Sequence, residues 1–251
     1  MAGKVSVDDV IVSKPGASVR ADASVRVRGA VGEYASRGGT KLAFALDAFG
    51  VDVSGQTALD AGASAGGFTE CLLRRGASRV YAVDVGHGQL HSRIAADPRV
   101  VVLERTNISD LSAASFADAI PSFCTADLSY LSLTKAVPIL EAVIEPSALM
   151  ICLVKPLFEG LATDEMRDPE SIRRVLYDFL PRLDSLASRR ILRCVASPVA
   201  GSKGAVEFFA LLGPEGPSLD YERAADAALE EAAAQHSLTG RAPGSPERAS
   251  D

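Results

Sequence analysis

The chain has 251 residues, which is long enough for one α/β domain with small appendages and a sizeable buried core. Its content of 47% hydrophobic and 23% charged residues is typical of soluble globular proteins, and no apolar run is long enough to cross a bilayer. The net charge of −6 is concentrated at the end, since residues 214–251 carry eight acidic and three basic side chains, which gives −5 there. Residues 1–41 are locally basic, which is compatible with binding to nucleic acid. The N-terminus lacks the layout of a secretory signal, so we expect a cytoplasmic protein without membrane contacts.

Cysteine and histidine usage argues against a metal centre. The four cysteines are widely spaced and form no CxxC pair, which favours buried thiols over disulfides or zinc ligands. The three histidines are His87, His91 and His236. We therefore expect no metal site and no catalytic design built on several histidines.

The first thirty residues alternate in short apolar runs around a "KPGA" turn at 14–17. This pattern predicts two or three short strands. They are too few to fold alone, so they must pack on something else or be part of a larger module.

Residues 36–50 predict a helix, with Thr40 as its N-cap and Gly50 at its end. Strand and helix patterns then alternate, which indicates an open, mostly parallel sheet covered by helices. Strands are expected at 57–61, 79–84, 100–104, 123–128, 148–154, 190–196 and 206–212. Helices are expected at 66–75, 88–96, 132–143 and 168–188, the last one capped by Asp168 and kinked or split at Pro181. Residues 219–235 are expected to be helical, and the Gly/Pro/Ser-rich end that follows to be disordered.

The stretch "LDAGASAGGFTE" at 59–70 predicts a strand, a tight turn and the start of a helix. Gly62 permits the turn, and Gly66 and Gly67 let a ligand approach the free N–H groups of the helix N-terminus. Asp60 precedes the turn, and Asp84 ends the next strand, where such folds bind ribose hydroxyls. A turn that needs glycine only for packing is the alternative. The two acids favour a nucleotide-type ligand.

The identity of that ligand depends on Ser64. The dinucleotide fingerprint is G-x-G-x-x-G, and Ser64 stands at its second glycine, the one that admits a pyrophosphate. S-adenosylmethionine carries no phosphate and fits this loop better than NAD does.

Seven segments stand in order over roughly residues 35 to 212: "SRGGTKL", "LDAGASAGGFTECLL", "AVDVGHGQL", "DPRVVVLERTNI", "ADLSYLSL", "LVKPLFE" and "GAVEFFALL". Together they resemble the TlyA-type ribosomal RNA methyltransferases, relatives of the FtsJ-like ribose methyltransferases. The resemblance implies a seven-stranded Rossmann-like methyltransferase sheet with helices on both faces, in a domain at 35–213. It also implies methyl transfer from S-adenosylmethionine to a cytidine 2′-hydroxyl of ribosomal RNA, with the ribosome or a subunit as partner.

The family's catalytic pattern of Lys, Asp, Lys and Glu finds matches in Lys41, Asp127, Lys155 and Glu207. Asp127 and Lys155 each follow an apolar strand, at the edge where open α/β sheets place their sites. Glu207 begins an apolar run, where an unpaired carboxylate would be costly. We expect Lys155 to be the base, because Lys41 and the sulfonium disfavour its protonated form. We expect Asp127 and Glu207 to orient the lysines and the hydroxyl. Structural ion pairs are the alternative for any one of these residues.

The remaining site predictions concern the cofactor and the substrate mouth. Cofactor contacts are expected from Gly62, Ser64, Gly66, Gly67, Phe68, Asp84 and Asn107. For Asn107 a structural role in a turn is the alternative, and for His87 and Gly88 loop geometry is the stronger interpretation. Phe158 and Glu159 are expected to shape the substrate mouth, while Leu157 stands where family members often have Gln.

Residues 1–30 look like the C-terminal, strand-forming half of an αL RNA-binding domain, the type first known from ribosomal protein S-four. The two helices that normally come first are missing, so we expect either a misplaced start or a truncation that lowers RNA affinity. Two other functions are weighed. One is a non-catalytic RNA-binding or ribosome-assembly factor. The other is a NAD-linked oxidoreductase, which Ser64 disfavours. The sequence gives neither the modified nucleotide nor the oligomeric state.

Overall fold

The computed structural model describes residues 5–8, 10–12, 17–20, 22–27, 34–116, 119–217, 219–236 and 238. The chain divides into two units, Met1–Glu33 and Tyr34–Asp251. The end of the chain at 239–251, expected to be disordered, lies outside the described residues, and so do residues 14–16 of the "KPGA" turn.

The first unit contains the short strands that the N-terminal pattern predicts. Within its described residues, β1 (Val5–Val7) pairs antiparallel with β2 (Val10–Val12) on one side and with β3 (Val25–Val27) on the other. Asp8 follows β1 with a left-handed φ of 47°, and its carboxylate accepts the N–H of Ser24 at 2.9 Å.

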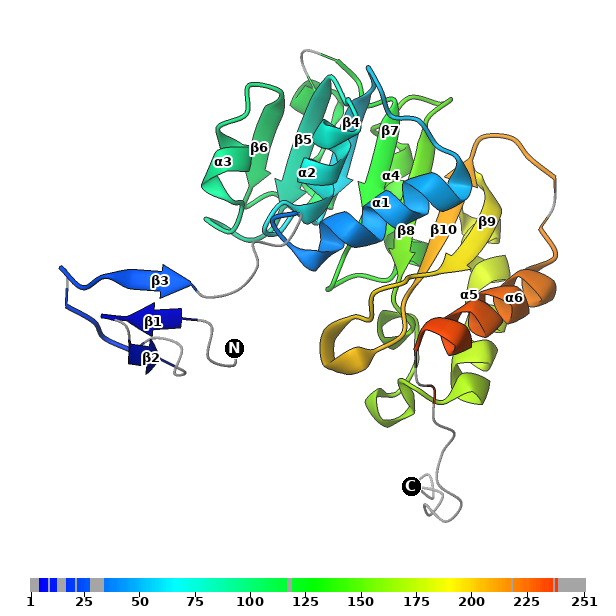
Figure 1. The fold of residues 1–251 in the computed structure, drawn as a ribbon. Helices are drawn as coiled ribbons and strands as arrows, with labels where there is room; N and C mark the ends of the chain where they lie inside the picture. The colour runs from blue at the N-terminus through cyan, green and yellow to red at the C-terminus, as the bar shows by residue number, and fades with distance from the viewer. Residues whose placement is uncertain are drawn as a thin grey trace, which may run out of the picture. The chain divides into compact units, whose positions relative to one another are not determined.

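The second unit is built on a sheet of seven described strands in the order β6-β5-β4-β7-β8-β10-β9 (Figure 1). Neighbouring strands are parallel from β6 to β8, and β10 runs antiparallel to both β8 and β9. The strands are β4 (Thr57–Ala61), β5 (Arg79–Asp84), β6 (Val100–Glu104), β7 (Phe123–Ala126), β8 (Leu149–Val154), β9 (Arg190–Ala196) and β10 (Phe208–Gly213). Each predicted strand is confirmed, with ends that differ by no more than two residues.

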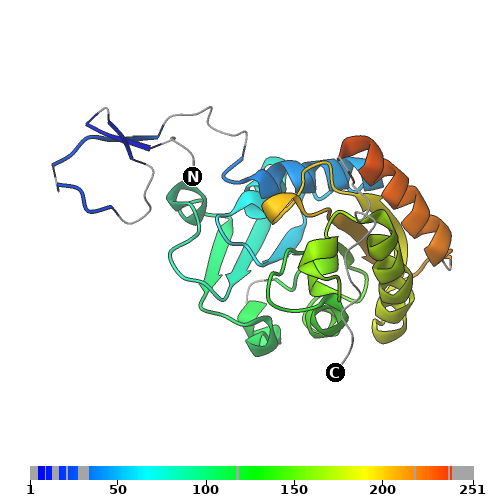
Figure 2. The ribbon, with the colours of Figure 1, turned by 90° about the horizontal axis from the view of Figure 1, so that it is seen from below.

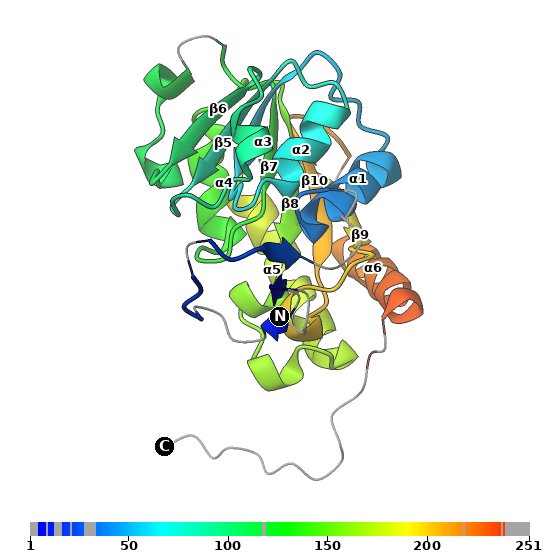
Figure 3. The ribbon, with the colours of Figure 1, turned by 60° about the vertical axis from the view of Figure 1, so that its left-hand side comes forward.

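Helices cover both faces of this sheet, as expected (Figures 2 and 3). Side chains alternate between the faces along each strand. On β8, Ile151 and Leu153 belong to the core under α1 and α2, while Met150 and Cys152 belong to the core under α4, α5 and α6. The helices are α1 (Arg37–Phe49), α2 (Gly67–Arg74), α3 (Ser92–Ala95), α4 (Leu133–Glu141), α5 (Pro169–Leu186) and α6 (Tyr221–Gln235).

The predicted N-cap of the first helix is wrong. α1 begins one turn earlier, because Ser36 is extended and its hydroxyl accepts the N–H of Gly38 at 3.2 Å. The two glycines that follow do not prevent helix formation, and Gly39 is required there, since a Cβ would lie 2.2 Å from the ring of Tyr34. At the other end, Gly50 is the left-handed C-cap, as predicted.

Two other helices differ from the expectation. α5 starts after the Asp168 cap and is not split at Pro181, because buried residues on both sides of the proline, Leu176 and Leu183 among them, hold the same face on the core. α3 is shorter than 88–96. Gly88 has a left-handed φ of 67° and His91 a non-helical ψ of 131°, so a helix does not run through them and begins only at Ser92.

Strand register decides which residues meet at the carboxyl edge of the parallel strands. Because β10 is antiparallel to β8 and Phe208 pairs with Val154, the residue before β10 lies beside the residue after β8. These residues are Glu207 and Lys155. Asp127 follows β7 at the same edge.

Candidate active site

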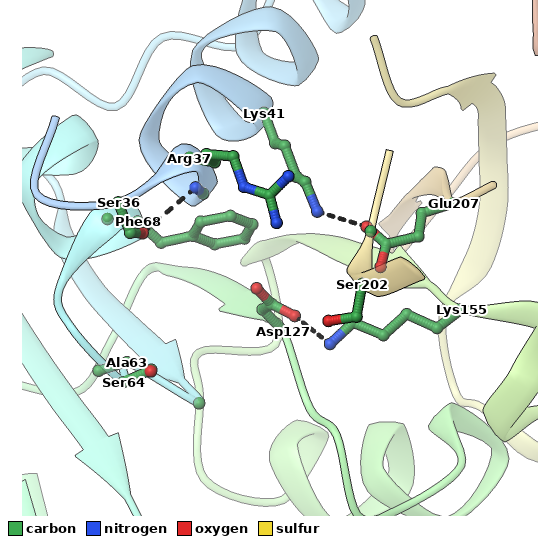
Figure 4. Close-up of a pocket in the computed structure, with 14 residues that line it drawn as sticks. Ser36, Arg37, Lys41, Ala63, Ser64, Phe68, Asp127, Lys155, Ser202 and Glu207 are labelled. Carbon is green, nitrogen blue, oxygen red and sulfur yellow. Dashed lines mark hydrogen bonds and ion pairs between the residues drawn. The ribbon is translucent and has the colours of Figure 1, made fainter. Parts of the chain in front are cut away.

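A cavity of about 300 Å³ opens at this carboxyl edge. Four different segments supply its charged side chains: Arg37 and Lys41 from α1, Asp127 after β7, Lys155 after β8 and Glu207 before β10 (Figure 4). Small residues of the loop after β4 form the opposite wall. Eight of the eleven predicted site residues line the cavity, namely Lys41, Gly62, Ser64, Gly67, Phe68, Asp127, Lys155 and Glu207.

Lys41 and Glu207 form a buried ion pair. Lys41 Nζ donates to Glu207 Oε2 at 2.5 Å, and the two side chains are only 9% and 8% exposed. Gly201 leaves room for the carboxylate, because a methyl group in place of its hydrogen would lie 2.1 Å from Glu207 Oε1. A buried carboxylate at the start of an apolar strand would be costly if unpaired, and the ion pair with Lys41 offsets that cost for Glu207.

Lys155 is held by two oxygen atoms. Its Nζ lies 2.6 Å from Asp127 Oδ1 and donates a hydrogen bond to Ser129 Oγ at 2.8 Å. Apart from this ion pair, Asp127 Oδ1 is buried and accepts no hydrogen bond from the described part of the chain. The cavity therefore contains two lysine–carboxylate pairs, and each lysine has its own acid.

The loop after β4 has the backbone shape that its glycines predict. Gly62 has a φ of 90° and Gly66 a φ of 92°, and Ser64 adopts the left-handed region as well, at 47°. A Cβ at Gly62 would lie 2.4 Å from the carbonyl oxygen of Asp127, so only glycine lets these two loops approach. Gly66 is the N-cap of α2, and no described side chain caps that helix.

Asp60, the acid before the turn, does not face the cavity. Its side chain is fully buried, and it accepts hydrogen bonds from Thr69 Oγ1 at 2.6 Å and Thr125 Oγ1 at 3.0 Å. Burial raises the pKa of Asp60 to about 6, although the two threonine hydrogen bonds lower it. Asp60 therefore ties β4 to α2 and β7. The inference that this acid favours a nucleotide-type ligand is wrong, because its side chain does not reach the cavity.

Three predicted cofactor residues lie outside the cavity lining. The Asp84 carboxylate accepts the N–H of Ser64 at 2.8 Å and that of Gly86 at 2.7 Å, so it fixes the loop after β4 against the loop after β5. Asn107 caps a short 3-10 helix by accepting the N–H of Ser109 at 3.1 Å. The third residue is Gly66.

The loop after β5 is organised by Glu104, at the end of β6. Its carboxylate accepts the N–H of Gly88 at 2.8 Å and lies 3.1 Å from Nδ1 of His87. The backbone hydrogen bond from Gly88 is the main cause that lowers the pKa of Glu104. In this arrangement His87 and Gly88 shape the loop, which agrees with the interpretation of these residues as part of the loop geometry.

Phe158 and Glu159 point in different directions. The Glu159 carboxylate accepts the hydroxyl of Ser132 and, at 2.9 Å, the N–H of Leu133, so it caps α4. Burial raises the pKa of Glu159. Phe158 is 42% exposed, and Nζ of Lys155 lies 5.7 Å from the centre of its ring.

Sequence reasoning missed six residues that line the cavity. Arg37 precedes Lys41 by four residues, so helical spacing places both on one face of α1 and could have revealed it. Nothing in the sequence singles out the loop before β10, which reaches the cavity through tertiary packing. The six are Ser36, Arg37, Gly38, Ala63, Gly201 and Ser202.

The described ranges offer neither a metal centre built from clustered ligands nor a membrane-spanning helix. They contain no group of three or more His, Cys, Asp or Glu side chains that could hold a metal ion. In the same ranges, no helix has the length and apolar character needed to span a bilayer.

The chain is similar to known methyltransferases over most of its length. The profile of the FtsJ-like methyltransferase family matches residues 34–213. The putative rRNA methyltransferase YqxC of Bacillus subtilis is 38% identical, over 88% of this chain and 82% of the relative. The 16S/23S rRNA (cytidine-2′-O)-methyltransferase TlyA of Mycobacterium tuberculosis is 40% identical, over 83% of this chain and 79% of the relative. A solved structure of a putative hemolysin from Streptococcus thermophilus superposes with a TM-score of 0.77 at 30% identity, over 94% of this chain and 88% of that one.

Proposed function

The chain belongs to the FtsJ-like methyltransferase family, and we propose that it methylates the 2′-hydroxyl of a cytidine in ribosomal RNA, with S-adenosylmethionine as donor. The names of the relatives support the substrate, since one is a 16S/23S rRNA (cytidine-2′-O)-methyltransferase and another a putative rRNA methyltransferase. A ribosomal substrate places the reaction in the cytoplasm. We also infer that residues 1–30 contact the RNA and that 35–213 form the methyltransferase domain.

The observation that carries this proposal is the convergence of two lysine–carboxylate pairs beside a loop of small residues (Figure 4). Residues far apart in the sequence, such as Lys41 and Glu207, come together within 2.5 Å. Structural ion pairs alone would not require a cavity between them, lined on its other side by glycine and serine.

The residues of this cavity fit S-adenosylmethionine. The carboxylate at its amino-acid end needs hydrogen-bond donors, and the N-terminus of α2, which no described side chain caps, provides them. Gly62, Ser64, Gly67 and Phe68 would form the wall that holds it. When bound, S-adenosylmethionine supplies an electrophilic methyl group on a sulfonium. Asp84, Gly66 and Asn107 remain predicted contacts for its other end.

Lys155 is assigned as the general base. Asp127 and Ser129 fix its Nζ at the cavity, and the neutral amine would take the proton from the 2′-hydroxyl as that oxygen attacks. The second pair, Lys41 and Glu207, is assigned to orienting the hydroxyl.

The test measures transfer of a tritiated methyl group to ribosomal subunits from cells that lack this modification. Lys155→Met removes the base and preserves the length of the side chain, and we expect a decrease of about 100-fold or more in the rate. Binding of S-adenosylmethionine, followed by calorimetry, should change little. Equal incorporation by wild type and variant would refute the base assignment, and nucleoside analysis that finds no 2′-O-methylcytidine would refute the substrate assignment.

The non-catalytic alternative makes a different prediction for the same experiment. A ribosome-assembly factor would bind S-adenosylmethionine and ribosomal subunits, but neither the wild type nor Lys155→Met would transfer a methyl group to the subunits. The NAD-linked alternative is disfavoured by the family, and a calorimetric titration with NAD should show no binding.

A further inference from the structure

A pocket of about 230 Å³ lies where α2, α3 and the segment that leads into β6 meet (Figure 3). It shares no lining residue with the active-site cavity. Two apolar side chains form part of its wall, and the rest is charged. We call it the arginine pocket, and its charged residues are Glu70, Arg74, Arg93, Asp97 and Arg99.

Two of the arginines share one carboxylate. Arg74 Nη2 donates to Glu70 Oε1 at 2.7 Å, and Arg93 Nη2 donates to the same oxygen at 2.8 Å and to Oε2 at 3.0 Å. Glu70 is only 10% exposed and also accepts the N–H of Ala35, at 2.6 Å. The single negative charge of this carboxylate can therefore neutralise only one of the two guanidinium groups.

The third arginine has all of its nitrogens engaged. Arg99 donates to Asp97 through Nε and Nη2, and its Nη1 donates to the carbonyl oxygen of Leu73. In the described part of the chain, Arg74 and Arg93 form hydrogen bonds through Nη2 alone. These two side chains are 44% and 47% exposed. Their Nε and Nη1 groups are thus available to a ligand that enters the pocket.

The charge and size of the arginine pocket match a phosphodiester group. Three guanidinium groups and two carboxylates leave one positive charge, and a phosphodiester carries one negative charge. A guanidinium binds phosphate oxygens through two parallel N–H groups. The pocket also has room for more than one water, which occupies about 30 Å³. An ion-pair network that only stabilises the fold is the alternative, and it predicts no contribution to RNA binding.

Helix α2 contributes to both sites. Gly67 and Phe68 in its first turn line the active-site cavity, and Arg74 at its end lines the arginine pocket. Phe68 and Arg74 are six residues apart, which is about 9 Å along a helix axis. An RNA whose reacting nucleotide lies in the active-site cavity could therefore bring another of its phosphates to the arginine pocket.

We propose that the arginine pocket binds a backbone phosphate of the RNA substrate, at a nucleotide other than the one that reacts. Arg74 and Arg93 donate the hydrogen bonds, and Arg99 adds positive charge. Such a contact positions the RNA on the methyltransferase unit and reads no base. The proposal rests on the proposed function, because it takes RNA to be the source of the phosphate.

The test measures the affinity for a fluorescein-labelled RNA hairpin by anisotropy at roughly 50 to 200 mM KCl. Arg93→Gln removes one cation and leaves Arg74 on Glu70. We expect it to weaken binding by about five- to tenfold at roughly 100 mM KCl and to reduce the slope of log affinity against log salt by about 0.7 to 1. Arg93→Lys keeps the charge and should keep the slope. Arg75→Gln is the matched control and should bind as wild type, because Arg75 pairs with Asp47 at 2.6 Å and does not line the pocket.

Inorganic phosphate is the other source of the same chemistry, and thermal unfolding with and without about 10 mM phosphate tests it. If phosphate stabilises wild type but not Arg93→Gln, while both bind the RNA equally, the pocket takes the free anion and the RNA assignment is wrong. Equal weakening of RNA binding by Arg93→Gln and Arg75→Gln would overturn the site as well. So would a lower melting temperature of Arg93→Gln with an unchanged salt slope, which a purely structural network predicts, or a wild type that does not bind the RNA.

The outcomes separate this proposal from the proposed function, since the binding assay measures no methyl transfer. If Arg93→Gln loses affinity and slope as expected, but wild type methylates no ribosomal subunit, the phosphate site stands and the catalytic assignment falls. If wild type methylates subunits and Arg93→Gln binds RNA as wild type does, the phosphate site is wrong and the catalytic assignment stands.

Discussion

Replacing Asp60 by asparagine should change how the stability of the protein depends on pH. Asp60 is buried beneath the loop after β4, and burial raises its pKa from 3.8 to about 6. The folded state therefore holds the proton more tightly than the unfolded state. Stability is highest while the carboxyl is protonated in both states, decreases as the pH rises from about 4, and levels off above about 6. The Asp60→Asn substitution would keep the shape of the side chain and remove this dependence.

The magnitude follows from the difference between the two pKa values. A difference of roughly two pH units between the folded and unfolded pKa of Asp60 corresponds to about 3 kcal/mol of unfolding free energy. Most of this is lost between about pH 4 and pH 7. Because the side chain is fully buried, solvent screening does not reduce this figure. We expect Asp60→Asn and wild type to be similarly stable at pH 4, and the variant to be more stable at pH 7 by about 2 to 3 kcal/mol.

Urea unfolding at intervals between pH 4 and pH 8 measures this difference, and other titrating groups cancel between variant and wild type. Thr69→Val serves as a second variant. It removes the 2.6 Å hydrogen bond that favours the ionised carboxylate, so its stability should fall further below wild type at pH 7 than at pH 4. Parallel pH profiles for Asp60→Asn and wild type would refute the reasoning.

Three further predictions concern the cavity. Glu207→Gln leaves the Lys41 ammonium buried without a carboxylate, so guanidinium unfolding should show a loss of about 3 to 5 kcal/mol, and the double variant with Lys41→Met should recover part of it. Gly201→Ala places a methyl group 2.1 Å from Glu207 Oε1, and the displaced carboxylate should lower the rate of tritiated-methyl transfer by about 100-fold; an unchanged rate would contradict a role for Glu207 in orientation. Lys203→Gly relieves a left-handed φ and should raise the unfolding free energy by about 1 kcal/mol.

The sequence predicted the strands well because each one is a short apolar run bounded by turn residues. It predicted less about charged residues that lie under the loops. Asp60 and Asp84 both resemble ligand-binding acids in the sequence, yet Asp60 bonds to two threonines and Asp84 to two backbone N–H groups. Which hydrogen-bond partner a carboxylate takes depends on distant residues such as Thr125, and no local pattern contains that information.

The start of α1 was missed for a related reason. Thr40 is as good an N-cap by composition as Ser36, and glycines at 38 and 39 argue against a helix there. The tertiary contact between Gly39 and Tyr34 overrides that propensity. The loop before β10 was missed as part of the site because Gly201 and Ser202 carry no chemical signal of their own.

The meeting of the four charged residues follows from strand parity. Phe123 on β7, Leu153 on β8 and Phe209 on β10 all belong to the core under α1 and α2. Side chains alternate along a strand, so residues an even number of positions away point to the same face. Asp127, Lys155 and Glu207 satisfy this condition, and each lies just beyond a strand end at one edge of the sheet. α1 covers that face, and Lys41 is its buried cation. The antiparallel direction of β10 is essential, because only then does the start of that strand, with Glu207, lie at the carboxyl edge of the parallel strands.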